Sequence, residues 1–230
     1  MQFDRDAEDL IINGLKESGH GFEVFTEERP PFTTCVEPRY RIVVDPVDGS
    51  TNVARGIMTA GVALAVLPIG APIRPDHVQW ALVGELFSGT VYSAQRGSGA
   101  FCNGRRCQVS ETRQLSDSMV GMNFDGRDLD TLRRFLTEKP VPSKVRRSGS
   151  SAMDIVYVAN GAYDAYVDIG HVLTAESFLA SLSIALEAGG VISDQHGQPL
   201  RDVTQLTDVF SLVVAGTKEL HQDILAKTNS

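Results

Sequence analysis

The chain has 230 residues, of which 42% are hydrophobic and 22% charged, and its formal net charge is -8. These values are ordinary for a globular protein with one large domain or two closely packed halves. The negative charge argues against a nucleic acid or an anionic membrane as the main partner, and the longest apolar stretch, residues 62–67, is too short to cross a bilayer.

The first half of the chain predicts one helix followed by several strands. Apolar residues at helical spacing predict a helix over residues 6–18, which Gly19 ends. Strands are expected over residues 41–44, 61–67, 80–87 and 90–94, with a Ser88-Gly89 turn between the last two. Residues 97–104 are typical of turns flanked by two short strands. Strands that follow one another without helices between them exclude a simple βαβ series.

The second half alternates strands and helices. Strands are expected over 119–123, 163–167 and 209–215, and helices over 129–136, 151–159, 178–188 and 218–226. The fold class is therefore mixed α/β (α+β). A polar stretch near residues 111–118 permits a boundary, so we expect an N-terminal α+β half over 1–115 and a C-terminal α/β half over 116–230.

The cysteines and the N-terminus bear on the compartment. Cys35, Cys102 and Cys107 form no C-x-x-C pair, and an odd number of cysteines gives no disulfide framework. The acidic N-terminus lacks the apolar run of a signal peptide. We therefore expect a cytoplasmic protein.

The run Asp45-Pro46-Val47-Asp48-Gly49-Ser50-Thr51-Asn52 follows an apolar strand. A proline-fixed turn can aim two carboxylates, from Asp45 and Asp48, and the carbonyl of Val47 at one point, and Mg²⁺ prefers such oxygen ligands. Backbone N–H groups and hydroxyls of residues 49–51 could hold a phosphate beside the cations, and a helix opening at Asn52 would add favourable partial charge. Taken alone, D-P-x-D-G is equally common in surface turns.

Three other features favour the metal site over the surface turn. Glu27 and Glu28 lack basic partners at helical spacing. Asp4 precedes the first predicted helix, although the role of a helix N-cap explains it as well. The run Glu187-Ala188-Gly189-Gly190 ends an apolar helix, which a C-cap also explains.

With these motifs, the sequence resembles the inositol monophosphatase family of Mg²⁺-dependent, lithium-sensitive phosphatases, which includes bacterial and archaeal fructose-1,6-bisphosphatases. The run D-P-V-D-G-S-T-N is similar to the family pattern D-P-[ILV]-D-G-[ST]-x-N. Further matches are T-E-E at 26–28, R-G-S-G-A-F-C-N-G-R-R at 96–106, G-S-S-A at 149–152, Y-D-A-Y-V-D at 163–168 and E-A-G-G-V-I-S-D-Q-H-G-Q-P at 187–199. The resemblance implies a layered α-β-α-β-α sandwich, usually dimeric, with the metal site in the N-terminal half and a substrate pocket completed by the C-terminal half.

The resemblance also implies a set of metal ligands. Glu27, Asp45 and the carbonyl of Val47 would hold a first Mg²⁺. Asp45 and Asp48 would share a second with an acid from a later helix, and Asp4 would lie near a third. Lithium would be expected to inhibit.

Further roles concern the substrate. The hydroxyl of Ser50, with Glu27 or Asp4, would orient the attacking water, which the metal ions activate. The N–H groups of Gly49 and Ser50 would bind the phosphate. Gly149, Ser150 and Ser151 would line the pocket for the rest of the substrate.

The sequence departs from the family pattern at two points. The acid of the later helix normally stands ten residues before the Glu of E-A-G-G, where this chain has Ser177, with Glu176 beside it. The helix could start one residue out of register so that Glu176 reaches in, the second metal could be weakly held, or the site could be disabled. The chain also begins at the position of Asp4, where the family has a preceding long helix, so either this layer has been lost or the natural protein is longer than this chain. A missing helix would expose apolar surface, which dimerisation could cover.

The expected function is hydrolysis of a small polyol or sugar phosphate, with inositol monophosphate as the first candidate and fructose 1,6-bisphosphate as the second. The alternative is a catalytically impaired family member that binds a phosphate ligand or a protein partner, for which Ser177 is the reason. The expected partners are a small-molecule substrate and a second copy of the chain.

Overall fold

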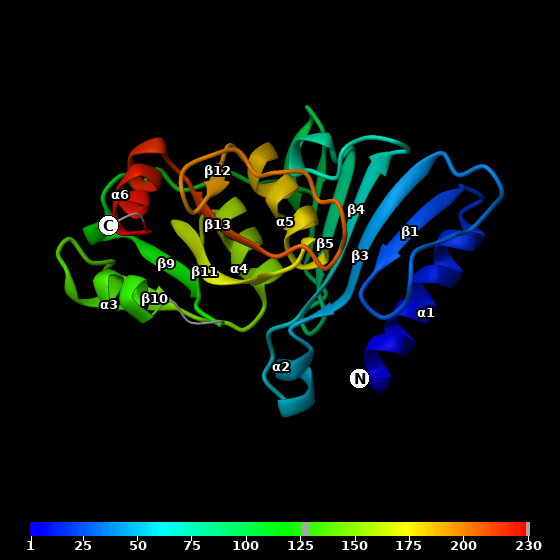
Figure 1. Ribbon diagram of the computed structural model, residues 1–230, viewed down its shortest axis with the longest axis horizontal. Coiled ribbons are helices and arrows are strands. Elements are labelled where there is room, and N and C mark those ends of the chain that lie inside the picture. Colours follow the sequence, from blue (N-terminus) through cyan, green and yellow to red (C-terminus); the bar gives the residue numbers. More distant parts are fainter. Residues whose placement is uncertain (126–128, 229–230) are drawn as a thin grey trace.

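Two β-sheets and three layers of helices alternate through the molecule (Figure 1). The structure, a computed structural model, describes residues 1–125 and 129–228. In order, the layers are helix α1, the first sheet, helices α4 and α5, the second sheet, and helices α3 and α6. This confirms the predicted α-β-α-β-α sandwich.

The first sheet has eight strands in the order β2-β1-β3-β4-β5-β6-β7-β8. All neighbouring pairs are antiparallel except β1 with β3. The first half of the chain comprises α1 (Gln2–Glu17), β1 (Phe22–Thr26), β2 (Phe32–Thr33), β3 (Tyr40–Asp48), α2 (Ser50–Arg55), β4 (Gly61–Pro68), the short 3-10 helix η1 (Pro75–His77), β5 (Trp80–Glu85), β6 (Val91–Gln95), β7 (Gly99–Cys102) and β8 (Arg105–Arg106).

The second sheet has five strands in the order β10-β9-β11-β13-β12. The second half of the chain comprises η2 (Leu115–Asp117), β9 (Met119–Asn123), α3 (Leu129–Thr137), β10 (Lys144–Arg146), α4 (Ser151–Ala159), β11 (Ala165–Leu173), α5 (Ala175–Glu187), β12 (Val191–Asp194), β13 (Phe210–Ala215) and α6 (Lys218–Thr228). None of the helices in the described ranges is long and apolar enough to span a bilayer.

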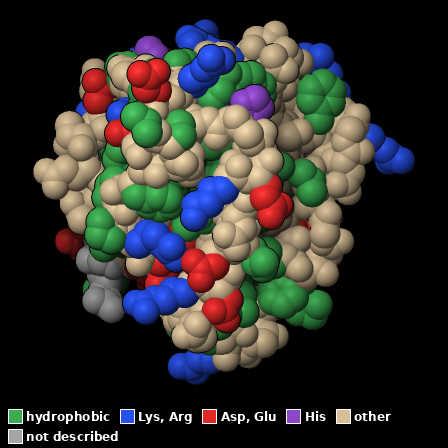
Figure 2. All heavy atoms as spheres, turned by 90° about the vertical axis from the view of Figure 1, so that its right-hand side faces the viewer, with side chains coloured by type: hydrophobic (Ala, Val, Ile, Leu, Met, Phe, Trp, Pro, Cys, Tyr) green, Lys and Arg blue, Asp and Glu red, His purple; other side chains and the backbone are tan. Residues whose placement is uncertain are grey.

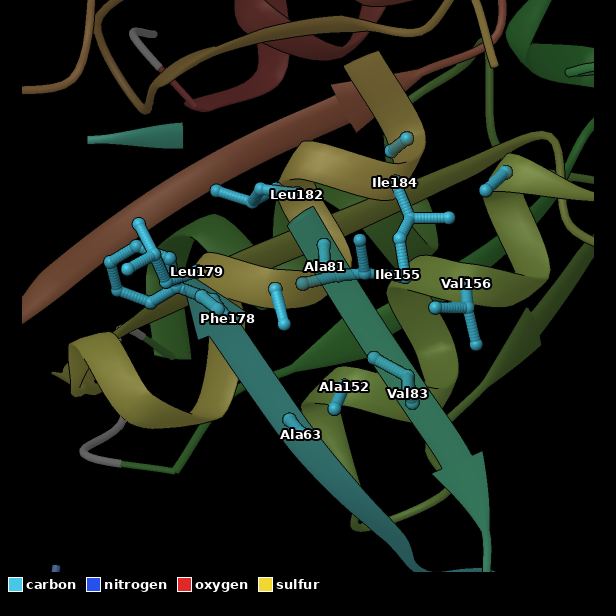
Figure 3. Packing of buried hydrophobic residues seen from close by; sticks show 14 of the residues in the cluster. Ala63, Ala81, Val83, Ala152, Ile155, Val156, Phe178, Leu179, Leu182 and Ile184 are labelled. Carbon is cyan, nitrogen blue, oxygen red and sulfur yellow. The ribbon is translucent and has the colours of Figure 1, made fainter. Parts of the chain in front are cut away.

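The two central helices, α4 and α5, are apolar on all sides because each packs between the two sheets. Small side chains on the facing strands let these helices approach closely. Ala63 on β4 and Ala81 on β5 belong to the same buried cluster as Ile155 of α4 and Phe178 of α5 (Figure 3). The main hydrophobic core is thus shared by both halves of the chain, and it fixes the N-terminal ends of α4 and α5 relative to β3.

Helix α1 covers only part of the outer face of the first sheet. Its apolar residues Ile11 and Leu15 pack against Phe22 and Ile42. Charged residues of both signs lie among apolar ones on this side of the molecule (Figure 2). Beyond α1, the sheet face carries a groove of about 510 Å³, whose lining includes the partly exposed Trp80.

Most predicted elements are present, with shifted ends in several cases. Residues 119–123 and 151–159 form the predicted strand and helix with the same bounds. Residues 22–26 form strand β1, which was not predicted, and the later strand spans 165–173 instead of the predicted 163–167. Strands β2, β10 and β12 were not predicted.

Candidate active site

The carboxylates of Asp45 and Asp48 lie at the end of β3, and both side chains are buried. Asp45 pairs with Ala63 and Asp48 pairs with Gly61, so β3 contains one more residue than β4 between these two pairs. Such a bulge bends the strand and turns both acids to one side. The backbone N–H of Val47 donates to Oδ1 of Asp45 at 3.0 Å, which stabilises the turn through Pro46.

Asp48 is held by the beginning of α4, which lies a hundred residues later in the chain. Its Oδ2 accepts hydrogen bonds from the hydroxyl of Ser150 at 2.6 Å and from the backbone N–H of Ala152 at 2.7 Å. Ser150 is the N-cap of α4, and its hydroxyl also accepts from the N–H of Met153 at 3.4 Å. The hydroxyl of Ser150 therefore orients a proposed metal ligand.

The phosphate-binding candidates Gly49 and Ser50 lie at the start of the short helix α2. Gly49 is its N-cap at a φ of 96°, and a Cβ there would lie 3.0 Å from the carbonyl oxygen of Thr59, so only glycine fits. The helix begins at Ser50, two residues before Asn52. Nδ2 of Asn52 donates to the carbonyls of Thr59 and Ser148, both at 2.8 Å.

Glu176 and Ser177 both lie in the first turn of α5, which begins three residues earlier than predicted. The hydroxyl of Ser177 donates to Oδ2 of Asp45 at 3.1 Å, so Ser177 faces the cluster as the count from Glu187 implies. Oε1 of Glu176 accepts from the hydroxyl of Thr174, while its Oε2 is buried and has no hydrogen-bond partner. Sequence reasoning missed Thr174, although its place just before an acidic first turn was a usable signal.

Glu27 and Asp4 approach from the α1 side. Glu27 follows β1 directly and is exposed, and Asp4 is buried in the first turn of α1. The N-cap is Met1, so the reading of Asp4 as an N-cap was wrong, and its carboxylate pairs with the amino group of Met1. Glu28 has a basic partner that helical spacing could not reveal, since it lies 3.3 Å from Nε of Arg5.

The acids of the cluster perturb one another. Burial raises the pKa of Asp45 well above its ordinary value, and the charges of Asp48, Glu27 and Glu176 raise it further. Burial also raises the pKa of Asp48 to about 6, against the hydrogen bonds from Ser150 and Ala152. The pKa of Glu176 is raised, again chiefly by burial. The pKa of Glu27 is also raised, first by loss of solvent around its carboxylate and then by the charges of Glu28 and Asp4.

These groups fit a hard divalent cation. All are oxygen donors, they repel one another, and Glu176 keeps an unpaired oxygen. Within the described ranges, no three Asp, Glu, His or Cys side chains form a metal site by themselves, so the carbonyl of Val47 and the hydroxyl of Ser177 count among the candidate ligands.

The remaining substrate-pocket candidates lie beside this cluster. Gly149 is exposed, at a φ of 84°, against the side-chain amide of Asn52. Ser150 is buried, with its hydroxyl bound to Asp48. The hydroxyl of Ser151 accepts a hydrogen bond from the hydroxyl of Tyr166 at 2.9 Å.

Known proteins resemble this chain in sequence and in fold. A sequence model described as the inositol monophosphatase family matches residues 1–230. The chain is 32% identical over 228 residues to a fructose-1,6-bisphosphatase/inositol-1-monophosphatase of Methanothermobacter thermautotrophicus, covering 95% of this chain and 79% of that one. It is 34% identical to an inositol-1-monophosphatase of Mesorhizobium japonicum, covering 85% and 72%. A crystal structure of the extragenic suppressor protein suhB from Bartonella henselae superposes with a TM-score of 0.84 at 28% identity, covering 100% and 85%.

Proposed function

Because the chain belongs to the inositol monophosphatase family, we propose that it is a Mg²⁺-dependent phosphomonoesterase acting on a small polyol or sugar phosphate. Inositol monophosphate is the first candidate substrate and fructose 1,6-bisphosphate the second, as the names of the relatives suggest. The observation that carries the proposal is the buried carboxylate cluster of Asp45, Asp48 and Glu176, whose charges are mutually unfavourable without a cation.

Six residues would hold the two or three metal ions: Glu27, Asp45, the carbonyl of Val47, Asp48, Glu176 and, through its hydroxyl, Ser177. Asp4 would lie near the third of these ions, on the α1 side. When bound, the ions supply Lewis-acid stabilisation of the phosphoryl oxygens and a water that loses its proton near neutral pH.

The protein's own groups position the reactants. The N–H groups of Gly49 and Ser50 would bind the phosphate oxygens, because the glycine N-cap leaves room for a close approach. The hydroxyl of Ser50, with Glu27 or Asp4, would orient the attacking water. Gly149, Ser150 and Ser151 would form the wall facing the rest of the substrate, with Ser150 acting mainly by holding Asp48.

Glu176 would supply the carboxylate that Ser177 lacks. Ser177 occupies the expected position, 3.1 Å from Asp45, but brings only a hydroxyl. Glu176, one residue earlier, brings a buried carboxylate with one unpaired oxygen. The comparisons give no support to the catalytically impaired alternative, since the two sequence relatives named above carry the names of phosphatases.

We further propose a cytoplasmic homodimer whose two halves, 1–115 and 116–230, act as one unit. The three cysteines are unpaired, which suits a reducing compartment. The apolar groove beside α1 suits a contact between subunits.

The two halves are proposed to act as one unit because helices α4 and α5 pack on both sheets. The first sheet lies within residues 22–106 and the second within residues 119–215.

Phosphate release tests the proposal. The purified protein is incubated with inositol 1-phosphate, fructose 1,6-bisphosphate and other sugar phosphates, with and without Mg²⁺, and then with Li⁺ added. Turnover that requires Mg²⁺ and falls with Li⁺ is expected. Absence of turnover on every substrate in the presence of Mg²⁺ would contradict an enzymatic function.

A further inference from the structure

The segment over residues 26–29, which carries the metal-ligand candidate Glu27, is held by the carboxylate of Glu8 in helix α1. The hydroxyl of Thr26 donates to Oε1 of Glu8 at 2.6 Å. Nε of Arg29 donates to Oε2 of the same carboxylate. The two oxygens of Glu8 therefore fix the segment on both sides of Glu27.

Glu27 has no comparable support of its own. Its side chain is exposed, and in the part of the chain that the structure describes its carboxylate forms no hydrogen bond or ion pair. It is nevertheless near enough to the buried acids of the cluster that its charge raises the pKa of Asp45. The position of Glu27 relative to Asp45 is therefore set by the backbone of the segment and by the residues that hold this backbone.

The burial of Glu8 is what makes its two contacts specific. Glu8 is 0% exposed, and both of its oxygens have partners. Taking a carboxylate out of water is costly, and a buried ion pair commonly contributes less to stability than apolar side chains of similar volume. Farther along α1, the residues that pack on the first sheet are apolar, namely Ile11 and Leu15. What an acid adds at position 8 is a fixed acceptor for two donors, which an apolar side chain cannot supply.

Helix α1 reaches the same segment at a second point. Arg5 lies one turn before Glu8, and its Nε is 3.3 Å from Oε2 of Glu28. Asp4, four residues before Glu8, lies on the same side of the helix and is also buried. Helix α1 therefore carries one acid of the proposed metal site, Asp4, and holds the segment that carries another.

We propose that Glu8 is a positioning residue: by binding Thr26 and Arg29 it holds the carboxylate of Glu27 in place for the metal ions. This inference rests on the proposed function, which makes Glu27 a metal ligand. Groups that orient metal ligands typically change metal affinity or activity by about 10–100-fold when they are altered. Glu8 acts on the backbone beside the ligand and not on its side chain, so we expect the lower end of this range.

The main variant is Glu8→Gln, which keeps the shape of the side chain and an acceptor for Thr26 but removes the charge that pairs with Arg29. One readout is the apparent Mg²⁺ Kd, obtained from the dependence of Tm on Mg²⁺ concentration without substrate. The other is kcat and KM for inositol 1-phosphate at saturating Mg²⁺. We expect the Mg²⁺ Kd to rise by roughly tenfold and kcat to fall, because Glu27 would also orient the attacking water. KM should change little, because the phosphate-binding candidates lie at the start of α2.

A double-mutant comparison tests whether Glu8 acts through Glu27. Glu27→Gln alters the ligand itself and should raise the Mg²⁺ Kd at least as much as Glu8→Gln does. The variant with both substitutions should have the Mg²⁺ Kd of Glu27→Gln, because the position of a side chain that no longer binds metal has no effect on affinity. If the two fold-changes multiply, Glu8 acts by another route and the proposal is overturned.

Thr26 offers a milder pair of variants that keeps the proposal testable if Glu8→Gln does not fold. Thr26→Val removes the hydroxyl that donates to Glu8 and keeps nearly the same size, whereas Thr26→Ser retains the hydroxyl. Thr26→Val should raise the Mg²⁺ Kd, by a smaller factor than Glu8→Gln, and Thr26→Ser should restore the wild-type value. Equal Mg²⁺ Kd values for the two Thr26 variants would contradict the proposal.

Glu23→Gln is the matched control on the same strand. Glu23 lies on β1, three residues before Thr26, and pairs with Nε of Arg41 on β3 at 2.8 Å. This variant should change Tm alone. The proposal is overturned if Glu8→Gln behaves like Glu23→Gln, or if the wild-type Tm does not respond to Mg²⁺. A wild type that binds Mg²⁺ but releases no phosphate refutes the proposed function instead, and the Mg²⁺ Kd values then still test the role of Glu8.

Discussion

Replacing Glu176 with glutamine separates a metal ligand from a residue that only supports the fold. Glu176 is 6% exposed, its Oε1 accepts from Thr174, and its Oε2 has no partner. The charges of Glu27 and Glu176 are mutually unfavourable, and a buried carboxylate without a cationic partner is destabilising. Glutamine keeps the acceptor for Thr174 and removes the charge. We therefore expect the metal-free protein to gain about 1 kcal/mol, or roughly 2–4 °C in Tm for a chain of this size.

The response to Mg²⁺ should change in the opposite direction. If loss of this ligand weakens binding about tenfold, a Mg²⁺ concentration of about 100 times the wild-type Kd stabilises the wild type by about 2.7 kcal/mol. The same concentration stabilises the variant by only about 1.4 kcal/mol. Thermal unfolding in EDTA and across a Mg²⁺ titration measures both effects.

Glu187→Gln is the matched control on the same helix. The Glu187 carboxylate accepts from the N–H groups of Gly97 and Gly99, both at 2.8 Å, and lies outside the cluster. This variant should lower Tm and leave the Mg²⁺ response unchanged. If Glu176→Gln behaves in the same way, Glu176 supports the helix and does not bind metal.

Three further predictions follow from individual positions. Ser177→Asp places a second carboxylate against Asp45. About 2 kcal/mol of repulsion should lower the Tm in EDTA by roughly 4–8 °C, while the Mg²⁺-induced rise in Tm becomes larger. An unchanged Mg²⁺ response would contradict this prediction. Burial raises the pKa of Asp168 to about 6 against hydrogen bonds from Asn123, Gly170 and Ser211, so the folded protein binds a proton that the unfolded chain releases near pH 4. The stability contributed by Asp168 is therefore full below about pH 4 and is lost as the pH rises through about 6. In urea unfolding, the free energy of unfolding of Asp168→Asn should rise relative to that of the wild type by about 2–3 kcal/mol between pH 4 and pH 7. Gly149→Ala forces a side chain into a φ of 84°, 3.1 Å from Oδ1 of Asn52, and should cost about 1–2 kcal/mol in urea unfolding and lower kcat/KM; a neutral result would show that the turn can relax.

Local sequence patterns predicted the parts of this molecule that local interactions determine. The run 45–52 reads as two acids around a proline after an apolar strand, and the structure places both carboxylates on one side of β3. The apolar composition of residues 151–159 and 178–188 predicted the central helices. A helix buried between two sheets has no polar face, so its residues are mostly apolar.

The contacts that complete the site are between residues far apart in the sequence, and no local pattern encodes them. Ser177 and Asp45 are separated by 132 positions, and Ser150 and Asp48 by 102. A count of ten residues back from Glu187 could point to Ser177, but only the packing of α5 against β3 shows that Ser177 reaches Asp45 and that Glu176 keeps an unpaired buried oxygen. Strand β1 was missed because five residues between turns give too short an alternation to recognise.

The central claim is that the acids at the end of β3 bind the cation that hydrolysis requires. The most direct test is Mg²⁺-dependent phosphate release from inositol 1-phosphate by the wild type and by Asp45→Asn, which keeps the size of the side chain and removes its charge. We predict Mg²⁺-dependent turnover by the wild type and a loss of about 100-fold or more in the variant, with a folded structure by circular dichroism. Turnover by Asp45→Asn at the wild-type rate would contradict the assignment of the site.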